Sequence, residues 1–212
     1  MYKKYIKRGL DLLFCLIALP LLLVVLVAVA IAIKLEDGGP VFYCAARLGM
    51  NKKVFKMYKF RSMKVNAPDI RNEDGTTYNA KDDPRITKVG RFIRETSLDE
   101  LPQILNILKG DMSFIGPRPS LPDMLSMYTP EEMPKLSVRP GITGYCQAYF
   151  RNSLPGSEKR LKDAWYAQNI TFMLDMKILI RTVLTVIKRE GLYTNDQGAS
   201  GAAKASSNVR SM

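Results

Sequence analysis

The sequence predicts an α+β, helix-rich membrane protein that carries a small β-hairpin or sheet. An uncharged, apolar run of 22 residues, at positions 12–33, is long enough to enter a bilayer. Residues 41–43 and 54–58 alternate in polarity as short strands do, with turn-forming residues at 38–40 and 49–51. Later segments repeat apolar residues at helical spacing, so most of the remaining secondary structure is expected to be helical.

Composition narrows the class of function. The chain has 212 residues, with 32 Lys and Arg against 20 Asp and Glu, which gives a net charge of +12. Its partners are therefore expected to be anionic, such as membrane lipid or a phosphorylated substrate. Nucleic acid is not expected, because no aromatic platform for stacking bases accompanies the charge. The lack of histidine excludes His-based catalysis, and three distant cysteines predict free thiols.

The apolar run has basic residues on both flanks. Lys7 and Arg8 precede it and Lys34 follows it, whereas a simple crossing usually leaves one flank poor in Lys and Arg. Pro20 lies inside the run, and proline breaks or kinks a helix because it lacks an N–H and clashes with the preceding turn. A re-entrant segment and a kinked span are equally compatible with this pattern. No cleavage site for a signal peptidase follows the run.

Two other features concern the membrane surface. Asp11 lies at the edge of the apolar run, where it either pairs with Lys7 or Arg8 one helical turn away or is an ordinary interfacial charge. Residues 172–189 combine apolar positions at helical spacing with a basic stripe. Such a helix either lies flat on an anionic surface or packs on the protein core, and the two are compatible.

The middle of the chain is expected to contain short helices separated by loops. Helices are predicted at 90–94, 103–109, 130–136 and 158–168, with Gly110 ending the second. Residues 64–83 lack periodicity and predict a long loop. The Gly-, Ala- and Ser-rich residues 198–212 predict a disordered tail.

Two adjacent carboxylates, Asp99 and Glu100, lie at an expected helix start. Ser97 precedes Glu100 by three residues, the spacing of a capping box, although Pro102 is also compatible with a helix that begins at Asp99. In either case the simplest interpretation is that the two carboxylates only cap a helix. A carboxylate can also attack phosphorus or hold a divalent metal ion. The neighbouring sequence favours this second interpretation.

Several cations accompany the two carboxylates. Arg118 and Arg139 each precede a proline, which restricts them to extended backbone and lowers the entropy lost when they bind phosphate. Arg94 precedes the carboxylates, and Lys59 and Arg61 form a further basic cluster, which is alternatively a solvated strand end. The combination predicts a site for phosphate chemistry.

The chain resembles the small monotopic phosphoglycosyl transferases of the bacterial sugar transferase family, similar to those that initiate protein N-glycosylation. The matching residues run in order from the amino terminus to about residue 189. They are Lys7-Arg8, Asp11, Gly39-Pro40-Val41-Phe42, Ala46-Arg47, Lys59-Phe60-Arg61-Ser62-Met63, Ser97-Leu98-Asp99-Glu100-Leu101-Pro102-Gln103, Lys109-Gly110-Asp111-Met112-Ser113, Gly116-Pro117-Arg118-Pro119 and Arg139-Pro140-Gly141-Ile142-Thr143-Gly144.

The resemblance implies a reaction and a location. A sugar-1-phosphate passes from a UDP-sugar to polyprenyl (undecaprenyl) phosphate, with release of UMP, at the cytoplasmic face of the bacterial inner membrane. Asp99 is implied to be the nucleophile and a ligand of Mg²⁺, and Glu100 its catalytic partner. The implied substrate-binding residues are Lys59, Arg61, Arg94, Arg118, Arg139 and Asp163, and the implied membrane-anchor residues are Lys7, Arg8, Asp11 and Pro20.

The resemblance also implies the organisation of the chain. Residues 1–36 are expected to form a re-entrant helix-break-helix anchor, and residues 37–197 a catalytic domain at the cytoplasmic face. Leu19 precedes Pro20 where family members usually have serine, so the hydroxyl that could bond a freed backbone carbonyl is absent. The sequence specifies neither the sugar nor the oligomeric state, and it is compatible with a dimer.

Overall fold

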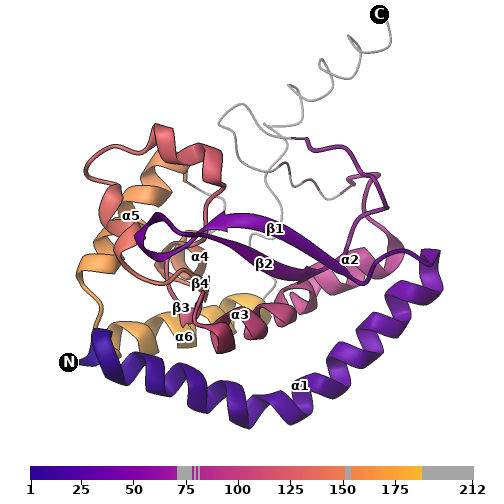
Figure 1. The fold of residues 1–212 in the computed structure, drawn as a ribbon, viewed down its shortest axis with the longest axis horizontal. Coiled ribbons are helices and arrows are strands. Elements are labelled where there is room, and N and C mark those ends of the chain that lie inside the picture. Colours follow the sequence, from indigo (N-terminus) through magenta and orange to yellow (C-terminus); the bar gives the residue numbers. More distant parts are fainter. Residues whose placement is uncertain (71–77, 79, 81, 151–153, 188–212) are drawn as a thin grey trace, which may run out of the picture.

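A long, bent helix lies along one side of a body of short helices and strands (Figure 1). The structure is a computed structural model that describes residues 1–70, 78, 80, 82–150 and 154–187. Helix α1 covers Lys7–Asp37 and follows a π-helical turn, η1, over Tyr2–Ile6. Pro20 lies inside α1 without ending it. The predicted break is therefore a bend within one continuous helix.

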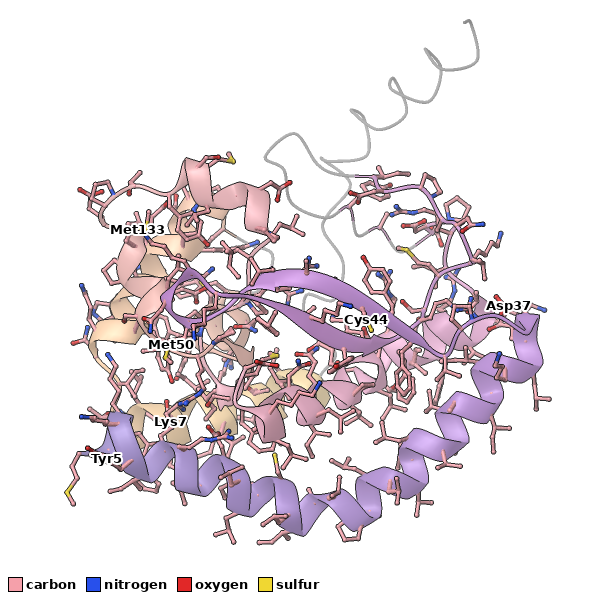
Figure 2. The ribbon with its side chains drawn as sticks, viewed as in Figure 1. Tyr5, Lys7, Asp37, Cys44, Met50 and Met133 are labelled. Atoms are coloured by element: carbon pink, nitrogen blue, oxygen red, sulfur yellow. The ribbon has the colours of Figure 1, made fainter. Side chains whose placement is uncertain are left out.

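Both ends of α1 contact the body, as the positions of Lys7 and Asp37 in Figure 2 indicate. Near the first end, Lys7 Nζ donates to Asp175 Oδ2 over 2.6 Å. At the other end, Asp37 accepts a hydrogen bond of 2.7 Å from Arg61 Nη1. The Glu36 carboxylate accepts from backbone N–H groups at the start of the next helix, where a negative charge is favourable.

The hairpin crosses the middle of the body (Figure 1). Strand β1, Phe42–Leu48, pairs antiparallel with β2, Val54–Phe60, from the Phe42–Phe60 pair to the Leu48–Val54 pair. The short helical turn η2, Met50–Lys52, connects them. The predicted hairpin is confirmed, although both strands extend further than their polarity pattern indicated.

The remaining elements follow in short units. Their bounds are α2 Lys88–Glu95, η3 Leu98–Gln103, α3 Ile104–Lys109, β3 Ser113–Ile115, η4 Pro122–Met127, η5 Met133–Ser137, β4 Gly141–Thr143, α4 Tyr145–Tyr149, α5 Gly156–Gln168 and α6 Phe172–Ile187. Strands β3 and β4 form a separate parallel pair, in which Ser113 lies opposite Gly141. Gly110 ends α3 with a φ of +91°, as predicted.

The core connects α1 to both the hairpin and the short helices. Cys15 of α1 packs with Met57 of β2 and with Ile104 and Ile107 of α3. Further along α1, Val29 and Ile33 pack with Phe60 of β2 and Ile93 of α2. A separate cluster joins Ile115, Ala148, Tyr166 and Ile178 of β3, α4, α5 and α6. One stripe of α1 is thus buried over both halves of the helix.

The opposite stripe of α1 is apolar and exposed. Together with η1, α1 is the one helix among the described residues that is long and apolar enough to cross a membrane. Its exposed large side chains are Leu13, Phe14, Leu16, Ile17, Leu21, Leu23, Val24, Val27, Ile31 and Leu35. So large an apolar surface on one helix is typical of contact with lipid.

Helix α6 packs one face on the protein core, and contact of its other face with an anionic surface stays a prediction. Asp175 and Ile178 are buried against the body, whereas Ile180 and Val183 are exposed. Residues 64–70, 78, 80, 82 and 83 of the predicted loop contain no helix or strand. The predicted disordered tail lies outside the described residues.

Candidate active site

Helix α2 is positioned by a close approach to the end of the hairpin. The Thr87 side chain accepts a hydrogen bond from the Gly90 N–H over 2.9 Å and caps the helix. A Cβ atom at Gly90 would lie 2.0 Å from the Ser62 carbonyl oxygen, so only glycine allows this approach. Arg94, in the last turn of α2, is thereby carried to the neighbourhood of η3.

The two carboxylates lie in the first turn of η3, as predicted. The predicted capping box is wrong, because the Ser97 side chain makes no capping hydrogen bond. Ser97 instead adopts a left-handed conformation with φ +58°, which is unusual for a residue other than glycine. The turn at Ser97 separates α2 from η3 and places Asp99 and Glu100 in the first turn of η3.

Lys59 of β2 lies between the two carboxylates. Its Nζ donates to Glu100 Oε1 over 2.6 Å and is 3.7 Å from Asp99 Oδ2. The Asp99 and Glu100 side chains keep 13% and 24% of their surface exposed, so a substrate can reach both. The site therefore combines two accessible carboxylates with one shared cation.

Asn106 of α3 holds the β2 backbone that carries Lys59. Its Oδ1 accepts from the Tyr58 N–H over 3.0 Å, and its Nδ2 donates to the Lys56 carbonyl over 2.7 Å. The Asn106 amide on α3 thus makes with the β2 backbone the two hydrogen bonds that a neighbouring strand would otherwise make. Because Asn106 is fully buried, it fixes how Lys59 on β2 faces the carboxylates that precede α3.

The surroundings shift the pKa values of Asp99 and Glu100 in opposite directions. Burial raises the pKa of Asp99, and the negative charge of Glu100 adds to the rise, which Lys59 and two arginines oppose. Burial acts in the same direction on Glu100, but the charges of Lys59 and Arg118 and the short bond from Lys59 more than offset it and lower the pKa of Glu100. Glu100 is thus held as the anion, whereas the ionisation of Asp99 depends on the cations around it.

Two of the predicted arginines act on the carboxylates. The charges of Arg94 and Arg118 both lower the pKa of Asp99. The Nη1 of Arg94 is buried and has no hydrogen-bond partner among the described residues, so it retains a donor for a ligand. The Arg118 side chain is exposed beside Pro117 and Pro119.

The other predicted substrate-binding residues make internal contacts. Arg61 is buried, with a bidentate interaction with Asp37 and further bonds to the Pro40 and Met63 carbonyls. Arg139 Nε donates to the Gly110 carbonyl at the end of α3. Asp163 is 1% exposed and accepts from the Arg118 backbone N–H. Their contact with a substrate stays a prediction.

The predicted anchor residues are brought together with α3 and α6. Arg8 donates to the Ile107 carbonyl over 2.6 Å, where a cation is favourable at a helix end. Asp11 accepts from the Ser113 hydroxyl and the Phe114 N–H, and Lys7 pairs with Asp175. Asp11 is buried and accepts these bonds from the body, which differs from both interpretations of the sequence, a pair with Lys7 or Arg8 and an ordinary interfacial charge.

Comparison with known proteins places the chain in a family. The model of the bacterial sugar transferase family matches residues 2–189. The chain belongs to this family. It is therefore an enzyme of the phosphoglycosyl transferase class.

Individual relatives agree with this assignment. The chain is 39% identical over 206 residues to the uncharacterized sugar transferase EpsL of Bacillus subtilis, covering 97% of this chain and 99% of EpsL. It is 40% identical over 205 residues to the undecaprenyl-phosphate galactose phosphotransferase of Salmonella typhimurium, covering 90% of this chain and 42% of that protein. A third relative, from Aeromonas hydrophila, is a UDP-N-acetylgalactosamine-undecaprenyl-phosphate N-acetylgalactosaminephosphotransferase, 39% identical over 189 residues that cover 86% of this chain and 44% of the relative.

Sequence reasoning missed several residues that organise the site of this sugar transferase. Asn106 and Lys135 make long-range polar contacts that no local pattern reveals. Asp37 was not singled out from the sequence, yet it pairs with Arg61. The one available signal was that Asn106 interrupts the apolar face of α3, since a polar residue at a core position needs hydrogen-bond partners.

The donor set suits a hard cation. The described residues contain no group of three or more His, Cys, Asp or Glu side chains that could hold a metal ion. Asp99 and Glu100 offer oxygen atoms alone, which suits Mg²⁺, because this ion usually keeps several waters and binds through one or two carboxylates together with substrate phosphates. The carboxylate pair therefore fits Mg²⁺ once a phosphorylated substrate is bound.

Proposed function

We propose that this protein transfers a sugar-1-phosphate from a UDP-sugar to undecaprenyl phosphate and releases UMP, the first membrane step of glycoconjugate assembly. The observation that carries the proposal is the placement of Asp99 and Glu100 in one accessible turn, with Lys59, Arg94 and Arg118 around them. The names of the relatives from Salmonella and Aeromonas support the acceptor and the class of donor.

In the first half of the reaction, the Asp99 carboxylate attacks the β-phosphorus of the UDP-sugar. A new O–P bond forms to Asp99, and the bond from the β-phosphorus to the bridging oxygen breaks, so that UMP leaves with that oxygen. A carboxylate approaching a diphosphate meets like-charge repulsion, which Lys59, Arg94 and Arg118 offset. The product of this step is a phosphosugar covalently held on Asp99.

In the second half, an oxygen of undecaprenyl phosphate attacks the same phosphorus and displaces the Asp99 carboxylate. The product is the undecaprenyl diphosphate sugar, and Asp99 returns to its starting state. Glu100 is proposed to assist this step: held as the anion beside Lys59, it can accept a hydrogen bond from a protonated lipid phosphate as that phosphate approaches. The two carboxylates differ in availability, because Lys59 bonds directly to Glu100 and leaves Asp99 freer to attack.

Mg²⁺ is proposed as the cofactor, held by Asp99 together with the donor phosphates. When bound, it would neutralise charge on the diphosphate and assist the departure of UMP. Lys59 Nζ lies 3.7 Å from Asp99 Oδ2, which is a longer distance than its 2.6 Å to Glu100 Oε1. Asp99 is therefore the more available of the two carboxylates for a metal ion.

We propose a monotopic, re-entrant arrangement at the cytoplasmic face of the inner membrane, and the attachment of both ends of α1 supports its re-entrant part. A straight crossing helix would place its ends about 30 Å apart on opposite sides of the bilayer. In this structure both ends of α1 are fastened to one polar body, through Lys7 and Asp175 at one end and Asp37 and Arg61 at the other. The exposed Ile180 and Val183 of α6 offer a second contact with anionic lipid.

Turnover tests the proposed reaction. The purified protein in detergent or nanodiscs is given a panel of UDP-sugars, undecaprenyl phosphate and Mg²⁺, and UMP release is measured. We expect release with one or a few UDP-sugars and dependence of continued turnover on the lipid. Asp123→Asn, which changes an exposed acidic residue of η4, serves as the matched control for Asp99→Asn. Failure of every UDP-sugar to release UMP contradicts the proposal.

Labelling tests the topology. Single cysteines are introduced as Lys4→Cys and Lys34→Cys, at exposed charged positions near the two ends of the apolar run, in a Cys44→Ser background, because Cys44 is exposed. We expect an impermeant maleimide to label both positions in inverted membrane vesicles and neither in intact spheroplasts. Labelling of the two positions from opposite sides contradicts the re-entrant arrangement.

A further inference from the structure

Arg118 is exposed, but a buried ion pair fastens the backbone that carries it. The Arg118 N–H donates to Asp163 Oδ2 over 3.3 Å. The same oxygen lies 3.2 Å from Lys135 Nζ. Asp163 is 1% exposed and Lys135 is 5% exposed, so water screens this interaction little. The contact therefore constrains the backbone at Arg118 more than an exposed hydrogen bond would.

Lys135 also reaches the other side of Arg118. Its Nζ donates to Ser120 Oγ over 3.1 Å, and this hydroxyl also accepts from the Tyr128 hydroxyl over 2.6 Å. One ammonium group thus bonds to the residue two positions after Arg118 and, through Asp163, to Arg118 itself. Pro117 and Pro119 limit the same stretch to a narrow range of φ. The backbone of Arg118 is consequently held from both sides.

The Lys135–Asp163 ion pair is buried among the described residues, below the exposed Arg118 side chain. The cavity beneath Arg118 has a volume of about 10 Å³, which is no more than the room needed for one water molecule. Its lining includes Pro117, Arg118, Pro119 and Lys135. A nucleotide or sugar phosphate must therefore meet the Arg118 side chain, while Lys135 and Asp163 stay below it.

We propose that Lys135 and Asp163 are positioning residues, which hold Arg118 where it meets the diphosphate of the sugar donor. The inference rests on the proposed sugar-phosphate transfer, because it takes the ligand of Arg118 to be that donor. It gives Asp163 a role through Arg118 instead of direct contact with substrate, and it brings in Lys135, which the sequence did not single out.

The chain offers a matched control pair. Arg160 Nε donates to Glu132 Oε2 over 2.8 Å, and this pair also joins α5 to the segment at η5. Glu132 and Arg160 are both buried, with exposures of 2% and 9%. Neither side chain bonds to Arg118 among the described contacts. If the Lys135–Asp163 pair served only to join these two elements, removal of either pair would have the same effect.

The experiment compares two double variants, Lys135→Met/Asp163→Leu and Arg160→Met/Glu132→Leu. Replacing both members of a buried ion pair by apolar residues is often neutral for stability, so both proteins are expected to fold. The measurements are the KM for the UDP-sugar, kcat, and hydrogen exchange at the Arg118 amide. We expect the first variant to raise KM about tenfold with little change in kcat, the loss of one well-placed charged contact, and to speed exchange at Arg118. The second variant should leave both unchanged.

Each outcome decides the question. Equal effects of the two double variants, or unchanged exchange at Arg118 in the first, overturn the proposal. Should the first double variant not fold, Asp163→Asn is compared with Glu132→Gln in the same measurements. If the unmodified protein releases no UMP from any UDP-sugar, the proposed function fails, whereas the exchange comparison still shows whether the ion pair holds Arg118.

Discussion

Lys59 gives the sharpest prediction, because one cation serves two carboxylates. In Lys59→Met its Nζ, which lies 2.6 Å from Glu100 and 3.7 Å from Asp99, is removed while the aliphatic stem is kept. Two unit charges about 4 Å apart interact by about 4 kcal/mol at an effective dielectric constant of about 20. The variant no longer has to desolvate the ammonium group, which leaves a net loss of about 3 kcal/mol. Because the same ammonium group is proposed to offset the charge of the donor diphosphate during the attack, an energy of similar size is expected to be lost from the transition state, and kcat/KM should fall roughly a hundredfold.

The pH dependence of Lys59→Met gives a second, independent readout. Asp99 must be ionised to attack phosphorus, so activity is lost as the pH falls through its pKa. Burial already raises this pKa and Lys59 opposes the rise, so removal of Lys59 raises it further. The acid limb of the pH–rate profile should consequently move to higher pH.

The assay is UMP release across a pH series, with Lys56→Met as the control. Lys56 is an exposed residue of the same strand, and its replacement changes the net charge by the same amount. An unshifted acid limb in Lys59→Met, or an equal shift in Lys56→Met, would refute the assignment of Lys59 to the two carboxylates.

Three other perturbations give distinct outcomes. Arg61→Met should lower the free energy of unfolding, because it removes the pair with Asp37 and the bonds from the buried guanidinium to the Pro40 and Met63 carbonyls; a raised KM for the UDP-sugar at low temperature, with stability unchanged, would instead indicate contact with substrate. Gly116→Ala should destabilise the protein by about 1–3 kcal/mol in denaturant unfolding, since its Cβ would lie 2.5 Å from the Arg139 carbonyl oxygen, whereas Gly9→Ala meets nothing within 4 Å and serves as control. Removal of Mg²⁺ with EDTA should abolish UMP release without changing the circular dichroism, and added Mg²⁺ should restore it; full activity in EDTA would contradict a metal-assisted transfer.

The sequence predicted the features that depend on local patterns. The hairpin followed from alternating polarity, the end of α3 from Gly110, and the carboxylates at a helical turn from the segment around Asp99. Pairing between strands extends β1 and β2 beyond their polarity pattern, because backbone hydrogen bonds do not depend on side-chain type. The left-handed Ser97 that replaces the capping box had no signal in the sequence.

Long-range partners were not predictable in the same way. Arg61 was assigned to substrate as one member of a basic cluster, but its partner Asp37 lies 24 residues away. Lys135 and Asp163 are 28 residues apart and meet only after α5 packs on η5. A charged residue in a single sequence does not show whether it faces a ligand or a buried partner, since both roles use the same chemistry.

Trapping the phosphosugar tests the central claim most directly. The protein is mixed with a UDP-sugar that carries ³²P in its β-phosphate, without lipid acceptor, and then quenched and separated from free nucleotide. The account predicts up to one equivalent of label on the protein with a matching burst of UMP, discharge of the label when undecaprenyl phosphate is added, and no label in Asp99→Asn. Labelling that persists in Asp99→Asn, or steady turnover with the lipid while the protein never carries label, would contradict it.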